Sequence, residues 1–169
     1  MMWKHIGSER PDFAEVPGPG QESVWDYPRP PALVEDTRRV EVFAEGKLIA
    51  STNRAFRVLE TASPPTFYLP PDSILSGSLE PVAGRSVCEW KGEAVYFALV
   101  DTTLPVAWAY PDPKPAFVAL RDFVGFYPGR VACFVEGERV RPQSGGFYGG
   151  WITDEIVGPV KGEPGTGHW

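Results

Sequence analysis

The stretch that decides the fold is RVEVFAEGKLIAST, residues 39–52. Polar and apolar side chains alternate in its first half, which places Val40, Val42 and Ala44 on one face of an extended chain. Glu45-Gly46 then offers a tight turn, because glycine tolerates positive φ, and the second half returns. The pattern predicts a β-hairpin with one face turned toward a hydrophobic core.

Further strands are expected after this hairpin, each bounded by turn-forming residues. Two of them are almost continuously apolar, which is typical of strands covered on both faces. The paired prolines at 64–65 and 70–71 interrupt the pattern and separate short extended pieces. The expected strands are 55–61, 66–69, 93–100, 106–110 and 130–135.

One α-helix is expected at about residues 115–127. Apolar side chains recur there at helical spacing, Pro115 suits a first helical turn, and Pro128-Gly129 would end the helix. The apolar stripe consists of Phe117, Leu120, Val124 and Tyr127. Together these elements predict a mainly β protein with small twisted antiparallel sheets, one helix and irregular arms at both ends.

Three regions of the chain differ in composition. Residues 1–37 are rich in proline and are expected to form an irregular arm, whereas residues 38–140 contain the expected strands and form the core domain. Residues 141–169 alternate glycine with large rings, most clearly at 145–151, and are expected to dock on the core because they cannot build one of their own. The aromatic stretch VWDYP, residues 24–28, is expected to dock on the same core.

Composition excludes several classes of function. The net charge is −6, and most of the acidity lies in the N-terminal arm, so binding to duplex nucleic acid is not expected. No apolar run approaches the roughly 20 residues that span a bilayer, and no secretory signal is recognised. Cys88 and Cys133 form no disulfide framework. We therefore expect a soluble, cytoplasmic protein that is a monomer or a weak homo-oligomer.

Common catalytic and cofactor motifs are absent from the sequence. Histidine occurs only at His5 and His168, so a catalytic histidine inside the core is not expected. There is no Cys-x-x-Cys pair, no Gly-x-x-x-x-Gly-Lys-Ser/Thr loop and no Gly-x-Gly-x-x-Gly turn. Neither a metal site nor a bound cofactor is expected.

Five short stretches carry a family resemblance. They are the segment 53–60, FYLP at 67–70, CEWKG at 88–92, WAYPDP at 108–113 and FYP at 126–128. In this order they resemble the family known as Domain of Unknown Function 427, over about residues 39–140.

The resemblance implies a β-tent fold, related to methionine sulfoxide reductase B and to the ligand-binding domain of cereblon. Those relatives often hold zinc with four cysteines, which this sequence lacks. The family is also called nucleotidyltransferase-like. Here Gly149-Gly150 is followed by Asp154-Glu155, which does not place two metal-binding carboxylates at alternating strand positions.

Three residues are candidates for catalysis. Cys88 lies close before Lys91, and a cation near a thiol favours the nucleophilic thiolate. Glu60 shares its predicted strand face with apolar residues, which suits a general base. The plainer alternatives are a buried, inert Cys88 and an ion pair of Glu60 with Arg54 or Arg57. As an enzyme, the protein would use Cys88 as nucleophile, Lys91 as activating cation and Glu60 as acid–base.

A second set of residues is a candidate for ligand binding. Arg54 and Arg57 could form an anion-binding corner with Lys91, or could be solvated surface groups. Four aromatic residues could line a pocket for a planar or cationic group, or could simply pack in the core. They are Tyr68, Trp90, Trp108 and Tyr110.

These residues support three hypotheses. The leading one is a domain that binds a small, anionic or planar molecule in a cleft near Glu60, Tyr68, Lys91 and Trp108. The first alternative is a metal-independent enzyme that uses Cys88. The second is an interaction adaptor whose arm and tail bind a partner.

Overall fold

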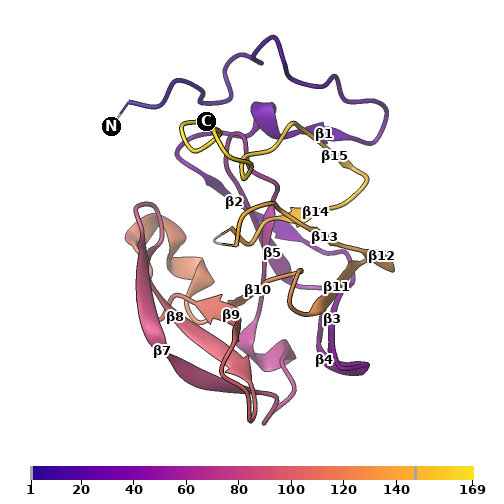
Figure 1. The fold of residues 1–169 in the computed structure, drawn as a ribbon, viewed down its shortest axis with the longest axis vertical. Coiled ribbons are helices and arrows are strands. Elements are labelled where there is room, and N and C mark those ends of the chain that lie inside the picture. The colour runs from indigo at the N-terminus through magenta and orange to yellow at the C-terminus, as the bar shows by residue number, and fades with distance from the viewer. Residues whose placement is uncertain (1, 147) are drawn as a thin grey trace.

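The computed structural model describes residues 2–146 and 148–169 and is mainly β, as predicted. Within the described residues, the largest sheet has seven antiparallel strands in the order β2-β5-β6-β10-β9-β8-β7. At one edge, β7 and β8 form a long curved hairpin (Figure 1). The strands are β2 (Ala32–Asp36), β5 (Ala55–Leu59), β6 (Thr66–Leu69), β10 (Val124–Phe126), β9 (Pro105–Ala109), β8 (Gly92–Leu99) and β7 (Leu79–Cys88).

The predicted hairpin forms one half of the second sheet, with β4 at the edge. Strands β3 (Val40–Ala44) and β4 (Lys47–Thr52) pair antiparallel around a turn in which Glu45 and Gly46 both have positive φ, of 52° and 77°. Val40 and Val42 are buried, as the alternation predicts. The sheet is completed by β11 (Ala132–Val135) beside β3 and by β12 (Glu138–Arg139).

The predicted α-helix at 115–127 is wrong. Residues Pro115–Leu120 form a short 3-10 helix, η3, which ends where Arg121 turns to ψ 122° and Asp122 takes a positive φ of 62°. Val124–Phe126 is the central strand β10, hydrogen-bonded to β6 on one side and β9 on the other. Pairing on both sides satisfies the backbone of Val124–Phe126 and buries all three residues, so tertiary contacts override the local helical pattern.

A hydrophobic core fills the space between the two larger sheets, and the tail contributes to it. Trp151 is fully buried, stacks on Phe67 with ring centroids 4.8 Å apart, and donates from its indole nitrogen to the carbonyl oxygen of Phe126 at 3.0 Å. Trp151 belongs to β14 (Trp151–Ile152), which pairs with β13 (Arg141–Pro142).

The arm and the tail also pack on each other. Strand β1 (Glu22–Ser23) runs parallel to β15 (Ile156–Val157), and the buried Trp25 donates to the carbonyl oxygen of Pro159 at 3.1 Å. Figure 1 shows both ends of the chain on the same side of the molecule, above β2. The remaining short helices are η1 (Val24–Asp26) and η2 (Pro71–Ser73). In the part of the chain that the structure describes, no helix is long and apolar enough to cross a membrane.

Trp151 is expected to determine how firmly the tail is held. Trp151→Ala removes a buried indole and should lower the free energy of unfolding by about 3–5 kcal/mol. Trp151→Phe keeps the stacking on Phe67 but loses the donor to Phe126, and should lower it by about 1–3 kcal/mol. Denaturant titration measures both, with the exposed Val16→Ala as a control expected within about 0.5 kcal/mol of the parent. A W151A protein as stable as V16A would contradict this account.

Candidate functional site

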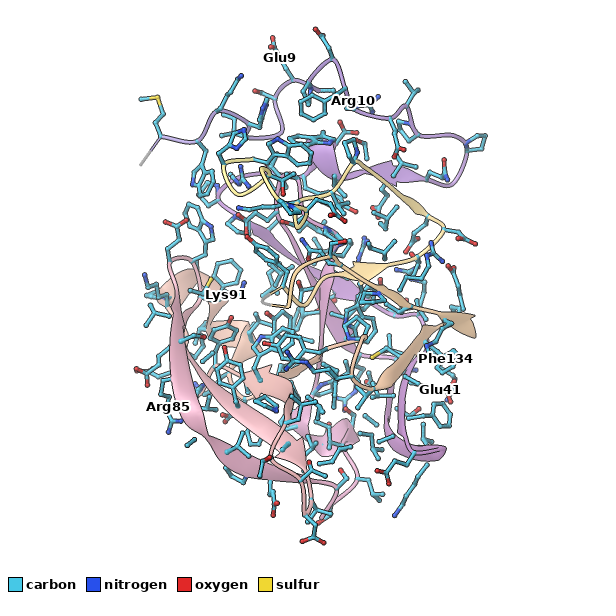
Figure 2. All side chains as sticks on the ribbon, in the orientation of Figure 1. Glu9, Arg10, Glu41, Arg85, Lys91 and Phe134 are labelled. Carbon is cyan, nitrogen blue, oxygen red and sulfur yellow. The ribbon has the colours of Figure 1, made fainter. Side chains whose placement is uncertain are left out.

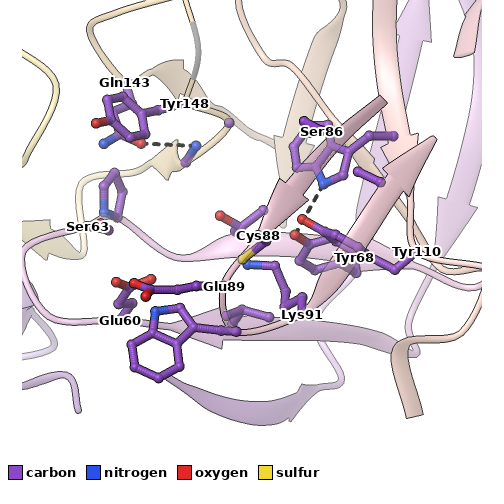
Figure 3. Close-up of a pocket in the computed structure, with 18 of the residues that line it drawn as sticks. Glu60, Ser63, Tyr68, Ser86, Cys88, Glu89, Lys91, Tyr110, Gln143 and Tyr148 are labelled. Carbon is purple, nitrogen blue, oxygen red and sulfur yellow. Dashed lines mark hydrogen bonds between the residues drawn. The ribbon is translucent and has the colours of Figure 1, made fainter. Parts of the chain in front are cut away.

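A cavity of about 430 Å³ lies over one face of the seven-stranded sheet, beside the turn that joins β7 to β8. Strands β5, β6, β8 and β9 contribute its floor, and residues of the tail and the arm cover it. Figure 3 shows the side chains that converge on this cavity. Its polar and aromatic lining includes Trp3, Glu60, Tyr68, Ser86, Cys88, Glu89, Trp90, Lys91, Tyr96, Trp108, Tyr110, Tyr127, Gln143, Tyr148 and Lys161.

The cavity brings together most of the residues that the sequence singled out. All three candidate catalytic residues and all four candidate aromatic residues line it, whereas Arg54 and Arg57 do not. The residues brought together are Glu60, Tyr68, Cys88, Trp90, Lys91, Trp108 and Tyr110.

Arg54 and Arg57 are held by carboxylates away from the cavity. Arg54 is exposed and pairs with Asp72 at 3.1 Å. Arg57 is largely buried and pairs with Glu22 at 2.7 Å and with Asp36 at 3.3 Å. Neither guanidinium group joins Lys91, so the predicted three-residue anion corner does not form in this structure.

A hydrogen-bonded group of aromatic residues forms the inner wall. The indole nitrogen of Trp108 donates to the hydroxyl oxygen of Tyr68 at 3.3 Å, and the ring of Trp108 lies 4.6 Å from that of Tyr127. Burial raises the pKa of Tyr68 and of Tyr110 above the usual range, and it raises the pKa of Tyr127 to about 12. All three side chains are therefore neutral phenols at physiological pH.

The position of Trp108 depends on two glycines. A Cβ atom at Gly125, in the neighbouring strand β10, would lie 2.6 Å from the indole ring. A Cβ atom at Gly149, in the tail, would collide with the six-membered ring of the same indole. The indole thus lies between the sheet and the tail at a distance that only glycine permits.

Arg29 organises the outer end of the cavity. Its side chain is buried and pairs with Glu60 at 3.2 Å, so Glu60 is an ion-pair partner, although not of the arginines expected from the sequence. Arg29 also donates to the main-chain oxygens of Thr61 at 3.0 Å and Trp169 at 2.7 Å, and its guanidinium lies 4.0 Å above the ring of Trp3.

Lys161 stands at the same outer end. Its amino group lies 5.2 Å from the centre of the Trp3 ring. Burial lowers the pKa of Lys161, and the nearby Arg29 lowers it further, whereas the carboxylates of Glu60 and Glu89 act in the opposite direction. Two carboxylates and two cations thus share this end of the cavity.

The inner end holds Cys88 and Lys91. Figure 3 shows the amino group of Lys91 on the side of Cys88 and Tyr68, away from the carboxylates of Glu60 and Glu89. It lies 5.7 Å from the centre of the Tyr110 ring. Cys88 is half-buried, whereas Cys133 is fully buried. Burial raises the pKa of the Cys133 thiol well above its usual range.

Sequence reasoning missed the lining residues that come from the arm and the tail. Trp3, Gln143 and Lys161 showed no pattern of their own and reach the cavity only through tertiary packing. The alternation of glycine and aromatic residues at 145–151 was the one available signal, and Tyr148 in that segment lines the cavity. Phe147, from the same segment, lies outside the described residues.

The described residues include no group of three or more His, Cys, Asp or Glu side chains that could hold a metal ion. The two acidic residues that follow the Gly149-Gly150 pair are both engaged by arginines. Asp154 pairs with Arg141 at 3.0 Å, and Glu155 pairs with Arg38 at 2.7 Å. These two carboxylates therefore do not form a metal-binding pair.

Comparison with known proteins gives the family. Among curated proteins, none matches this chain. One family model matches residues 32–137, more than half of the chain, in agreement with the resemblance of the five sequence stretches. The matched region contains Glu60, Cys88 and Lys91, but not Trp3 or Lys161. The chain belongs to the family described as Domain of unknown function (DUF427).

Proposed function

We propose that the protein binds a small molecule with a planar group in the cavity beside the β7–β8 turn. The observation that carries the proposal is the convergence of indole and phenol rings on one hollow of about 430 Å³. This volume is within the range of small-molecule sites, which are usually lined by aromatic residues with a few polar groups.

The partial exposure of Trp90 supports a stacking role. Trp90 is half-buried at the β7–β8 turn and lines the cavity, so one part of its ring is supported by protein and another is accessible. The buried Trp108 and Tyr68 form a rigid wall, because the hydrogen bond between them fixes both rings. A planar molecule between these surfaces would exclude water from aromatic faces.

A second candidate function is metal-independent catalysis by Cys88. One observation favours it: the half-buried thiol lies in the same cavity as Lys91 and Glu60. An adaptor role has less support, since Trp25 in the arm and Trp151 in the tail are buried in the protein itself.

Stacking on Trp90 is testable with simple planar probes. Indole, quinoline and 2-naphthylmethanol are offered to the full chain, and a probe that binds should raise the melting temperature by mass action. Trp90→Ala should weaken the binding of such a probe by about 3- to 10-fold in calorimetric titration, because one aromatic contact is lost.

Phe43→Ala is the matched control for this experiment. Phe43 is a half-buried aromatic residue that packs on Phe134 in the other sheet, outside the cavity. Figure 2 shows Phe134 and Lys91 on opposite sides of the molecule. Probe affinity should be unchanged in F43A. Failure of every probe to bind, or an equal loss in both variants, would refute the proposal.

The catalytic candidate predicts a selective thiol reaction. At pH 7, iodoacetamide should alkylate Cys88 faster than free cysteine, whereas Cys133 should react only after unfolding because it is buried. Lys91→Met should slow the reaction by removing the nearby cation. Mass spectrometry locates and times the label. A Cys88 that reacts no faster than free cysteine, or equally fast in K91M, would remove this candidate.

A further inference from the structure

We propose that the inner end of the cavity is a subsite for an oxyanion, a carboxylate or phosphate group carried by the ligand, with Lys91 as its cation. The inference rests on the proposed function, because it assumes that the cavity binds a small molecule. It adds which group of the ligand lies innermost and which side chains recognise it.

The charges at the two ends of the cavity differ. At the outer end, two cations offset the negative charges of Glu60 and Glu89. Arg29 forms an ion pair with Glu60, and the carboxylates of Glu60 and Glu89 attract the ammonium group of Lys161. At the inner end, Lys91 has no carboxylate within ion-pair distance among residues 2–146 and 148–169. The amino group of Lys91 lies 5.7 Å from the centre of the Tyr110 ring. Lys161 also forms no ion pair among the described residues, but it is attracted by the carboxylates of Glu60 and Glu89, whereas Lys91 lies beside Cys88 and Tyr68 and away from those carboxylates.

The hydrogen bonds at the inner end leave an excess of donors. The Trp108 indole can only donate, and it donates to Tyr68. The hydroxyl oxygen of Tyr68 is therefore an acceptor, and the hydroxyl of Tyr110 lies close enough to act on Tyr68 electrostatically. Residues 2–146 and 148–169 offer no acceptor within hydrogen-bond distance to the proton of either phenol.

Both phenols retain their protons, because burial strongly disfavours their ionised forms. The other groups at this end are an ammonium, which only donates, and the thiol of Cys88, which is a weak donor. Cys88 acts electrostatically on both Tyr68 and Tyr110, and Lys91 acts on Tyr110, so these four groups face one another.

An oxyanion satisfies all of these groups at once. Its oxygens accept hydrogen bonds from an ammonium and a phenol, and its charge compensates Lys91, giving charge-assisted bonds in a partly desolvated place. A cationic group would be repelled there, and an apolar group would leave the donors without acceptors. Arg54 and Arg57 play no part, because carboxylates elsewhere already hold them.

Three probes with the same ring system test the subsite. 2-Naphthylmethanol is neutral, 2-naphthoate carries a carboxylate and 2-naphthyl phosphate carries a phosphate. In calorimetric titration of the full chain at low salt, at least one anionic probe should bind about 10-fold or more tightly than the alcohol. The tighter of the two anions identifies the type of oxyanion.

Variants then assign the preference to Lys91. Lys91→Met should abolish the preference, so that the variant binds the anionic probes no more tightly than the alcohol, and Tyr110→Phe should reduce the preference in part. Lys91→Gln, which keeps a polar side chain, guards against a folding defect in K91M. Lys47→Met is the matched control, since Lys47 is an exposed lysine at the β3–β4 turn.

The outcomes separate this inference from the proposed function. Equal affinities for the alcohol and both anions would overturn the oxyanion subsite and leave planar binding intact. A preference that survives in both K91M and K91Q would also overturn it. Binding of none of the three probes at millimolar concentration would overturn planar binding and the subsite together.

Discussion

The site depends on the close packing of the Trp108 indole between Gly125 of the sheet and Gly149 of the tail. Because no larger residue fits at either glycine, the contact fixes three features together. It holds the tail against the sheet and places the indole nitrogen within 3.3 Å of the Tyr68 hydroxyl. It also requires an extended backbone at Gly125, where strand β10 pairs with both β6 and β9. The inner wall of the cavity is thus a consequence of backbone packing.

A second interaction closes the cavity from outside. Arg29 is buried, and a buried guanidinium is costly unless its donors are satisfied. It meets this requirement with Glu60 and with the main-chain oxygens of His5, Thr61 and Trp169. One side chain therefore links the arm, the segment after β5 and the end of the tail, and it fixes a carboxylate at the mouth of the cavity. The Arg29–Glu60 ion pair and the main-chain acceptors around Arg29 thus form a structural frame at this end of the cavity.

Local patterns in the sequence were sufficient to locate the hairpin β3–β4, because alternation and a Glu45-Gly46 turn specify its buried face and its turn, although not the register shift between Val42 and Phe43. They failed at 115–127, where helical spacing competes with pairing partners that lie far away in the sequence. The residues of the candidate site were likewise predicted only where a local pattern located them. Tyr68, Cys88, Lys91 and Trp108 come from strands and a turn that the pattern located, and they do line the cavity. Trp3 and Lys161 reach it through tertiary packing, which no local pattern encodes.

The residues that the sequence located and the residues that it missed come from different parts of the chain. The donors of the inner end, namely Tyr68, Cys88, Lys91 and Tyr110, all lie inside residues 32–137, the part matched by the family model. The frame of the outer end takes Trp3, Arg29 and Lys161 from outside that part. Water in the cavity can accept hydrogen bonds from these donors, and the proposed oxyanion would replace that water with charge-assisted hydrogen bonds. If the proposed oxyanion subsite is correct, the groups that select the ligand lie in the matched region, whereas the arm and tail supply Trp3, Arg29 and Lys161 at the outer end.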